Sequence, residues 1–317
     1  MTDVAGARPP EPPRRRASEP TAAKTTTRRI EIIVNPLSGG VGPRAARECE
    51  RLLETLNIDA NLTEIDPRHI EAGLEQALSS KPDVLVVLAG DGTARAATAL
   101  AGPKGPLIAP LPGGTMNLLP RALYGAVDWK KALEIALMEG VARPIAGGEV
   151  DGRPFQVAAI LGSPALWAPA REAVRSGKLR LAYLYARRAA RRAFARTLRY
   201  CIDDQPSRRG EAVAILSPLI SKAMEEPTGL EVAQVDFKTA GDAFRLAAKT
   251  LFADWRADST VETVVAQRVL VSAMRPIPAI LDGEPCELGH VAEARFKPCS
   301  FRALAPKRIL TAASEPA

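Results

Sequence analysis

The sequence contains few of the residues on which several common kinds of functional site depend. Two of its 317 residues are histidine, and its four cysteines are scattered without a C-x-x-C spacing. Such a chain favours neither a His-based triad, nor a disulfide framework, nor a zinc site. Aromatic residues make up 4% of the chain, too few for a surface that stacks nucleic-acid bases. No apolar run reaches the roughly 18 residues of a membrane span and no secretory signal is recognisable, so we expect a cytoplasmic protein.

The net charge of +7 is unevenly distributed along the chain. Residues 1–29 and 171–199 together carry more positive charge than the chain as a whole, so the remainder is mildly acidic. Residues 1–28 are rich in Pro, Arg, Ala and Thr and contain almost no large apolar side chains. A segment of this composition buries too little surface to fold. We therefore expect a disordered basic tail.

The second basic segment has the spacing of an amphipathic helix near residues 179–199. Apolar and small residues recur on one face of this helix, and arginines recur on another. Two interpretations remain open: a solvated helix face, or peripheral contact with an anionic membrane surface. We expect no nucleic-acid partner. The arginines that would contact the membrane are Arg187, Arg188, Arg191, Arg192 and Arg196.

The first half of the chain alternates between strand and helix patterns. This alternation predicts an α/β domain with a parallel sheet over residues 29–143. After about Arg143 the pattern changes to short apolar runs between Pro and Gly turns, which is typical of a mainly antiparallel β domain, here residues 144–304. The expected strands of the first domain are 30–34, 60–65, 84–88 and 106–110, and its expected helices are 43–56, 67–78, 94–101, 116–123 and 128–138.

Two glycine turns follow strands of the first domain. Gly90-Asp91-Gly92-Thr93 comes directly after the apolar run 84–88, and Gly113-Gly114-Thr115 follows the next expected strand. Such turns let the backbone approach a ligand, and the helix start that follows presents N–H groups to an anion. The plain alternative is an ordinary strand–turn–helix connection with Thr93 as the N-cap. Because a carboxylate beside phosphates calls for a cation, Asp91 points to Mg²⁺, bound directly or through water.

A third short pattern, Asp282-Gly283-Glu284, follows an apolar run near the end of the chain. An Asp-Gly pair at such a place is a common hairpin turn, and the charges can be incidental. Alternatively, a carboxylate placed beside a substrate hydroxyl can take its proton as a bond to phosphorus forms. The pattern alone leaves both interpretations open.

Four motifs together resemble the signatures of the diacylglycerol kinase catalytic family, which includes bacterial lipid kinases, sphingosine kinases and ceramide kinases. The order and spacing of the four are specific, although no single motif is, and the resemblance runs from about residue 30 to about residue 309. The motifs are Asn35-Pro36 with Ser38-Gly39-Gly40, Ala89-Gly90-Asp91-Gly92-Thr93, Pro112-Gly113-Gly114-Thr115-Met116-Asn117 and Leu281-Asp282-Gly283-Glu284.

The resemblance implies a phosphofructokinase-like α/β domain and a β-sandwich domain that receives the lipid. It also implies that residues 305–317 return to the first domain and complete it, and that ATP and Mg²⁺ bind in the cleft between the two domains. By the same resemblance Glu284 is the proton acceptor, and Asp282 supports it or shares a metal. The residues implied to bind the nucleotide are Asn35, Gly39, Thr63, Gly90, Asp91, Gly92, Thr93, Gly114, Thr115 and Asn117.

Several positions depart from the family pattern. Arg95 and Ala96 stand where the family commonly has Asn-Glu, and Leu118 stands where it has Asp. Thr228 replaces the Asp of a structural Mg²⁺ site that many bacterial members have in the β domain. These departures indicate a divergent member whose lipid need not be diacylglycerol. We hypothesise from the sequence that Arg95 reaches a phosphate in place of the amide.

The leading hypothesis from the sequence is an ATP-dependent lipid kinase that acts at the membrane surface. A second hypothesis is a phosphotransferase like the NAD kinases, which share the Gly-Asp-Gly-Thr turn. A third is a protein of the same fold that binds nucleotide or lipid without turnover. The motif 282–284 and the second glycine turn favour the first hypothesis over the second, and the departures at Arg95, Ala96 and Leu118 motivate the third.

Overall fold

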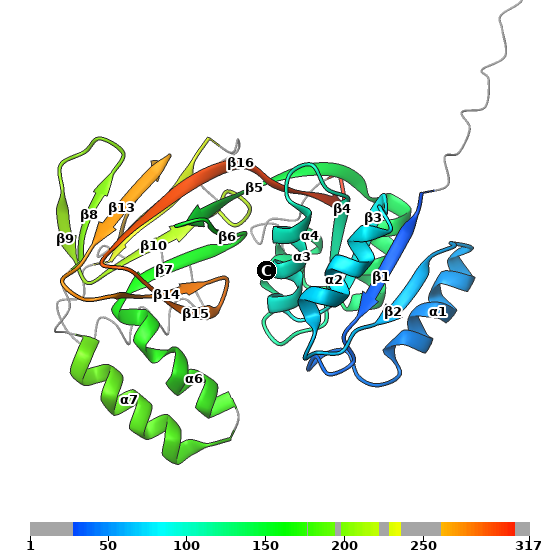
Figure 1. The fold of residues 1–317 in the computed structure, drawn as a ribbon, viewed down its shortest axis with the longest axis horizontal. Coiled ribbons are helices and arrows are strands. Elements are labelled where there is room, and N and C mark those ends of the chain that lie inside the picture. The colour runs from blue at the N-terminus through cyan, green and yellow to red at the C-terminus, as the bar shows by residue number, and fades with distance from the viewer. Residues whose placement is uncertain (1–27, 176, 194–197, 222–227, 236–260, 308–317) are drawn as a thin grey trace, which may run out of the picture.

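The computed structural model describes residues 28–175, 177–193, 198–221, 228–235 and 261–307. These residues form two bodies, connected by a pair of long strands that cross the top of Figure 1. Almost all of the expected basic tail, residues 1–28, lies outside the described residues. So do Arg196 and residues 308–317.

The first body contains a parallel sheet in the order β2-β1-β3-β4. Right-handed crossovers place α2 and α3 on one face of this sheet and α1 and α5 on the other, because the chain reverses its direction across the sheet after β2. The elements are β1 Ile30–Val34, α1 Ala45–Leu56, β2 Asn61–Glu64, α2 Ile70–Ser79, β3 Val84–Ala89, α3 Asp91–Ala101, β4 Leu107–Pro112, α4 Leu118–Tyr124, α5 Trp129–Glu134 and a short π-helix Ile135–Glu139.

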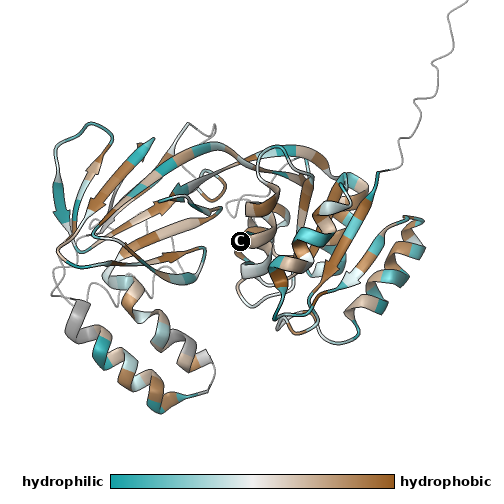
Figure 2. Ribbon diagram, in the orientation of Figure 1, coloured by the Kyte–Doolittle hydropathy of each residue, from teal (hydrophilic) through white to brown (hydrophobic). Residues whose placement is uncertain are grey.

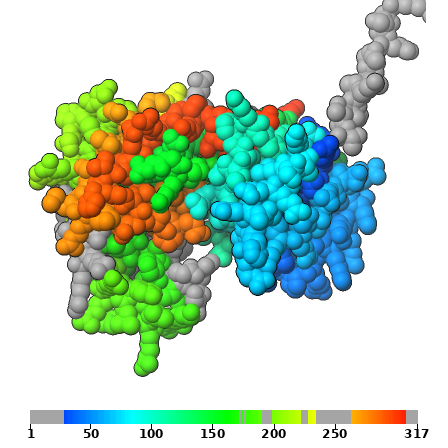
Figure 3. All heavy atoms as spheres, in the orientation of Figure 1, coloured from blue at the N-terminus to red at the C-terminus, as the bar shows by residue number. Residues whose placement is uncertain are grey.

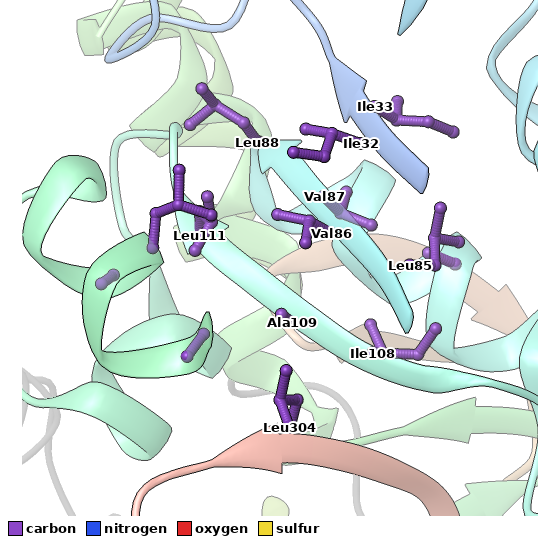
Figure 4. Packing of buried hydrophobic residues seen from close by; sticks show 14 of the residues in the cluster. Ile32, Ile33, Leu85, Val86, Val87, Leu88, Ile108, Ala109, Leu111 and Leu304 are labelled. Carbon is purple, nitrogen blue, oxygen red and sulfur yellow. The ribbon is translucent and has the colours of Figure 1, made fainter. Parts of the chain in front are cut away.

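Burial explains why β3 is apolar along its whole length. Every residue of Val84–Ala89 is buried, since helices cover both faces of the sheet. The side chains of β1, β3 and β4 pack together in one core, and Leu304, near the C-terminal end of the described residues, packs against them (Figure 4). The strand ends that carry the glycine turns are therefore held by a close-packed core.

Two long strands, β5 (Val141–Val150) and β16 (Val291–Ala305), pair antiparallel and belong to both bodies. Near its end β16 also pairs in parallel with β4, with Ala303 opposite Ile108. The register of the β5–β16 pair shifts between Lys297 and Phe301. The boundary expected near Arg143 thus lies inside β5, and the chain returns to the first body within β16.

The second body is a sandwich of antiparallel sheets around a second core, which confirms the expected fold class. One sheet has the order β12-β11-β10-β7-β14-β15, and the other extends from β16 through β13 and β8 to β9. Its elements are β6 Arg153–Phe155, β7 Ala158–Gly162, a 3-10 turn Ser163–Trp167, α6 Ala168–Arg175, α7 Leu179–Ala193, β8 Leu198–Ile202, β9 Arg208–Gly210, β10 Ala212–Leu216, β11 Leu230–Val235, β12 Val261–Ala266, β13 Arg268–Ser272, β14 Ile277–Leu281 and β15 Glu284–Leu288.

Some expected boundaries are wrong. Helix α3 begins at Asp91 and not at Ala94, so the Gly-Asp-Gly-Thr pattern is the first turn of the helix. The basic helix α7 is described to Ala193, and Leu198 and Arg199 belong to β8. Helical periodicity continues across residues 194–199 in the sequence, but pairing with β9 and β13 decides the structure of the last two.

Helices α6 and α7 form a hairpin that projects from the sandwich (Figures 1 and 3). Hydrophilic and hydrophobic residues alternate along α7 (Figure 2), and Leu179 and Tyr183 are 70% and 67% exposed. Among the described residues, no helix has the length and apolar character that a membrane-spanning segment needs.

The contact between β16 and helix α4 of the first body gives a test of the fold. Tyr124 at the end of α4 is almost fully buried, and its hydroxyl donates a hydrogen bond of 2.6 Å to the Leu304 carbonyl. We expect Tyr124→Phe to lower the free energy of unfolding by about 1–2 kcal/mol, because it leaves a buried carbonyl without its donor. Chemical denaturation measures this loss. The exposed Tyr183→Phe is the matched control, and equal unfolding free energies for the two variants would contradict the assignment.

Candidate active site

Three loops at the carboxyl ends of the parallel strands are joined by backbone hydrogen bonds. The Gly40 N–H donates to the Gly113 carbonyl (3.0 Å), and the Gly113 N–H donates to the Ala89 carbonyl (3.1 Å). The Gly90 N–H donates to Ser38 Oγ (3.1 Å). The loops after β1, β3 and β4 therefore form one cluster, as the sequence predicts for neighbouring strand ends.

Glycine is required at two places in this cluster because the loops approach too closely for a side chain. A Cβ on Gly113 would lie 2.6 Å from Val41 Cγ2, and a Cβ on Gly114 would lie 2.9 Å from the Gly90 Cα. Real Cβ atoms almost never approach other atoms so closely. The second glycine turn thus packs directly on the first.

Asn35 shapes the first loop from a buried position. Its side-chain Oδ1 accepts the Leu37 N–H (3.1 Å), and its carbonyl accepts the Ser38 N–H (3.1 Å). Gly39 follows in the same loop, and a Cβ on it would lie 3.7 Å from Thr115 Oγ1. Asn35 organises the turn, while Gly39 and Thr115 face each other across the loop cluster.

Helix α3 presents its N-terminus to the cluster. Gly90 is the N-cap, Asp91 and Gly92 are the first helical residues, and Thr93 is buried one position later. The alternative of Thr93 as N-cap is therefore wrong. The first N–H groups of an α-helix have no carbonyl partner within the helix and favour an anion. This geometry suits a phosphate group.

The Asp91 carboxylate joins the two glycine turns. Its Oδ2 accepts the Asn117 N–H (2.8 Å) and its Oδ1 accepts the Leu118 N–H (2.6 Å), so it caps α4. Asn117 has a left-handed backbone (φ 52°), and its Oδ1 accepts the Gly114 N–H at 2.7 Å. Asp91 contacts residue 118 through the backbone N–H and not through the side chain. An apolar side chain at Leu118 is therefore compatible with the loop structure.

The same contacts limit what Asp91 can do for a cation. Both carboxylate oxygens accept a backbone N–H group, so a directly bound Mg²⁺ would have to share them with these donors. In the part of the chain that the structure describes, no three His, Cys, Asp or Glu side chains gather in a way that could hold a metal ion. A magnesium role through water stays a prediction.

Asp282 and Gly283 form a tight hairpin turn between β14 and β15. Both have positive φ (48° and 88°), and Leu281 pairs with Glu284 across the turn, as in a type I′ hairpin. The turn nevertheless brings a charge to the loop cluster. A Cβ on Gly92 would lie 3.5 Å from Glu284 Oε1, so an exposed carboxylate from the second body reaches the first turn of α3.

Asp282 is buried and holds the hairpin to the chain before β7. Its carboxylate accepts the N–H groups of Gln156 (2.7 Å), Val157 (2.8 Å) and Ala158 (2.9 Å). Burial raises the pKa of Asp282, and the three N–H donors and the charge of Arg95 oppose this rise. Because the Asp282 carboxylate is buried among these N–H donors, its geometry favours a structural role, in which it fixes the hairpin that carries Glu284, over a role as a metal ligand.

Thr63 lies apart from the loop cluster. It is exposed on β2, opposite Ile33 of β1. Together with Asn61, Glu64 and residues of α2 it lines a polar pocket of about 490 Å³. Its role in nucleotide binding stays a prediction, as do the roles assigned to the other candidate residues.

Sequence reasoning did not identify two parts of the site. The first part is Ser38, whose Oγ accepts a hydrogen bond from the Gly90 N–H. Its place in the first motif was the signal that could have identified it. The second part is a pocket of about 310 Å³ between the helical hairpin and the sheet, lined by Pro285 and Cys286, which follow Glu284 in the sequence. No periodicity reveals this pocket, because its apolar residues resemble core. Its lining residues are Ala165, Leu166, Pro169, Tyr185, Arg188, Ala189, Ala279, Pro285 and Cys286.

Comparison with known proteins agrees with the resemblance seen in the motifs. Residues 29–150 match the family model of the diacylglycerol kinase catalytic domain. This match confirms the resemblance for the segment that contains the first three motifs. A sequence search of curated proteins gave no match.

Solved structures show the same fold at low sequence identity. A diacylglycerol kinase from Bacillus anthracis str. Sterne aligns with a TM-score of 0.64 and 16% identity, over 90% of this chain and 100% of that one. A second structure from this strain, provisionally named a diacylglycerol kinase, aligns with a TM-score of 0.66 and 20% identity over the same shares. An Archaeoglobus fulgidus NAD kinase in complex with ATP reaches 0.48 at 13% identity, over 88% of this chain and 94% of that one.

The contact between the glycine turns can be tested directly. We expect Gly114→Ala to weaken binding of a nucleoside triphosphate about tenfold or more, because the added Cβ separates the second turn from Gly90. Titration calorimetry measures the affinity, and circular dichroism checks that the fold persists. Gly289→Ala is the control, since its Cβ would meet nothing closer than 3.5 Å. Unchanged affinity in a folded Gly114→Ala protein would show that the close contact does not serve the ligand.

Proposed function

We propose that this chain, whose residues 29–150 match a diacylglycerol kinase catalytic domain, transfers the γ-phosphate of ATP to the hydroxyl group of a lipid. The observation that carries the proposal is the position of Glu284. Its carboxylate comes from the second body and lies against Gly92, in the first turn of the helix that would hold the phosphates. A proton acceptor and a phosphate cradle therefore face each other across the two bodies.

The residues of the chain divide the work of phosphoryl transfer. The N-terminus of α3 and the backbone of the glycine turns hold the phosphates of Mg-ATP, whose metal ion arrives with the nucleotide and neutralises phosphate charge. Glu284 takes the proton of the acceptor hydroxyl as its oxygen bonds to the γ-phosphorus. The bond between that phosphorus and the bridging oxygen breaks, and ADP leaves with that oxygen. The proton then passes from Glu284 to solvent.

The pocket between the helical hairpin and the sheet supports an amphiphilic acceptor. Pro285 and Cys286, which follow Glu284 on β15, form one wall of the pocket. Leu166 and Tyr185 form part of the opposite wall, and Arg188 adds one positive charge. Apolar walls of this kind suit an acyl chain or another hydrocarbon body, while the hydroxyl end lies toward Glu284.

The helical hairpin α6–α7 supports action at a membrane surface, where the enzyme would bind peripherally from the cytoplasm. Leu179 and Tyr183 expose apolar surface on this hairpin, as does Trp167 in the 3-10 turn just before α6. Arg180 and Arg187 are also exposed on α7. Apolar side chains that enter the interface, together with basic side chains that contact anionic headgroups, give reversible membrane binding. Arg188, Arg191, Arg192 and Arg196 belong to the same proposal, although no side-chain structure is described for the last three.

The reaction is tested by transfer of labelled γ-phosphate from Mg-ATP to a panel of hydroxyl lipids in anionic vesicles. We expect the wild type to label one lipid class, and Glu284→Gln to reduce kcat by about 100-fold or more, because the amide cannot accept the proton. Glu287→Gln, on the same exposed strand, is the matched control.

Three outcomes contradict the proposal. Equal lipid labelling by the wild type and Glu284→Gln would remove Glu284 as the base. Transfer to NAD and to none of the lipids would indicate a soluble acceptor instead. Tight ATP binding without transfer to any acceptor would indicate a binding protein.

Membrane binding is tested by sedimentation with vesicles of phosphatidylcholine and phosphatidylglycerol. We expect Arg180→Glu with Arg187→Glu to weaken binding at least about 30-fold, since each basic residue near an anionic surface contributes about 1 kcal/mol. Raised salt should weaken wild-type binding in the same direction. Arg47→Glu with Arg51→Glu makes the same charge change on α1, and an equal loss in both double variants would refute a specific role of the hairpin.

A further inference from the structure

Arg95 lies where α3 meets the chain segment that Asp282 holds. The helix begins at the proposed phosphate site, and Arg95 comes one turn later, between Gly92, which lies near Glu284, and Thr98. Thr98, three residues further on, accepts a hydrogen bond of 3.4 Å from Gln156 Nε2. The backbone N–H of Gln156 in turn donates to Asp282. We call these four residues, Arg95, Thr98, Gln156 and Asp282, the junction.

The junction contains two charged side chains, Arg95 and Asp282, that do not form a direct ion pair. Arg95 is half-buried, and its Nε is fully buried with no hydrogen-bond partner among the described residues. Asp282 is buried, and the charge of Arg95 acts on it. No ion pair joins the two within the described parts of the chain. An unpaired guanidinium nitrogen in such a place is costly unless a nearby opposite charge offsets it, and the carboxylate of Asp282 offers that charge.

The junction lies between the two parts of the proposed active site. Asp282 begins the turn that leads to Glu284, and Gly283 at the tip of this turn lies near Met116 and Leu118, with a virtual Cβ 3.8 Å from Met116 Sδ. These neighbours of Gly283 carry no charge. The charged groups around this turn are Arg95 from α3, the Glu284 carboxylate against Gly92, and the Asp282 carboxylate, which also accepts three backbone N–H groups.

We propose that Arg95 is a positioning residue: it lies on α3 between Gly92 and Thr98, and its buried guanidinium holds the 281–284 hairpin with Glu284 against the first turn of α3. This inference rests on the proposed function. It replaces the hypothesis that Arg95 reaches a phosphate. In the ionised state both oxygens of Asp282 accept the N–H groups of Gln156, Val157 and Ala158. A protonated Asp282 loses one acceptor, and the hairpin loosens.

The experiment is a double-mutant cycle in the full-length protein with Arg95→Gln, Asp282→Asn and the two combined. We expect each single variant to lower kcat by about 10- to 100-fold with KM for ATP nearly unchanged, because Glu284 is displaced while the phosphate site is intact. The combined variant should be no slower than the slower single variant, since both changes break one link. Arg95→Lys should recover most of kcat, and Arg51→Gln on the far face of the sheet should have no effect.

The pH profile separates positioning from a merely structural role. Removing Arg95 raises the pKa of Asp282 further, so the ionised form is lost at a higher pH as the solution is acidified. We expect the acid limb of kcat to move to higher pH in Arg95→Gln and to stay near the wild-type position in Arg95→Lys. An unmoved acid limb in Arg95→Gln would overturn the inference.

Two other results would also overturn it. Additive losses in kcat would show that Arg95 and Asp282 act separately. A large rise in KM for ATP at unchanged kcat would make Arg95 a phosphate ligand. The midpoints of thermal unfolding of the same three variants give a readout that does not depend on activity. Non-additive shifts of the midpoint support the coupling of Arg95 to Asp282 even if no acceptor is phosphorylated. Additive shifts refute this coupling. Failure of the proposed function is thereby distinguished from failure of this inference.

Discussion

The pairing of β5 with β16 is the constraint on which the rest of the structure depends. These two strands cross from the parallel sheet into the sandwich, and β16 ends beside β4 inside the first core. Strand pairing fixes the direction and register of both bodies through backbone hydrogen bonds. The carboxyl ends of β1, β3 and β4 therefore face the β14–β15 hairpin, although nearly two hundred residues separate Gly92 from Glu284.

The proposed chemistry follows from this arrangement. The first body supplies rigid backbone groups that suit phosphate, because Asp91 and Asn117 tie the two glycine turns together. The second body supplies the carboxylate that suits proton transfer and an apolar pocket lined by Pro285 and Cys286 of the same strand. Neither body alone contains both groups. The proposed reaction would therefore depend on how well the contacts around Asp282 hold Glu284 against the first body.

The sequence predicted the glycine turns better than it predicted the helix boundaries. Glycine and capping patterns depend on local backbone geometry, so the turns at Gly90 and Gly114 were visible in the sequence. The start of α3 at Asp91 was not, because glycine in the first turn weakens the helical pattern there. The strand at Leu198 was likewise hidden, since pairing with distant strands overrides local helical spacing.

By itself the sequence determined the α/β and antiparallel β pattern, the glycine turns and the presence of a carboxylate after an Asp-Gly turn, because these depend on local periodicity and on residue chemistry. The tertiary structure alone decided what those residues touch. It assigned Asp91 to two backbone N–H groups, buried Asp282 against Gln156, Val157 and Ala158, and brought Glu284 to Gly92. Such contacts arise from long-range strand pairing and core packing, which no local pattern specifies.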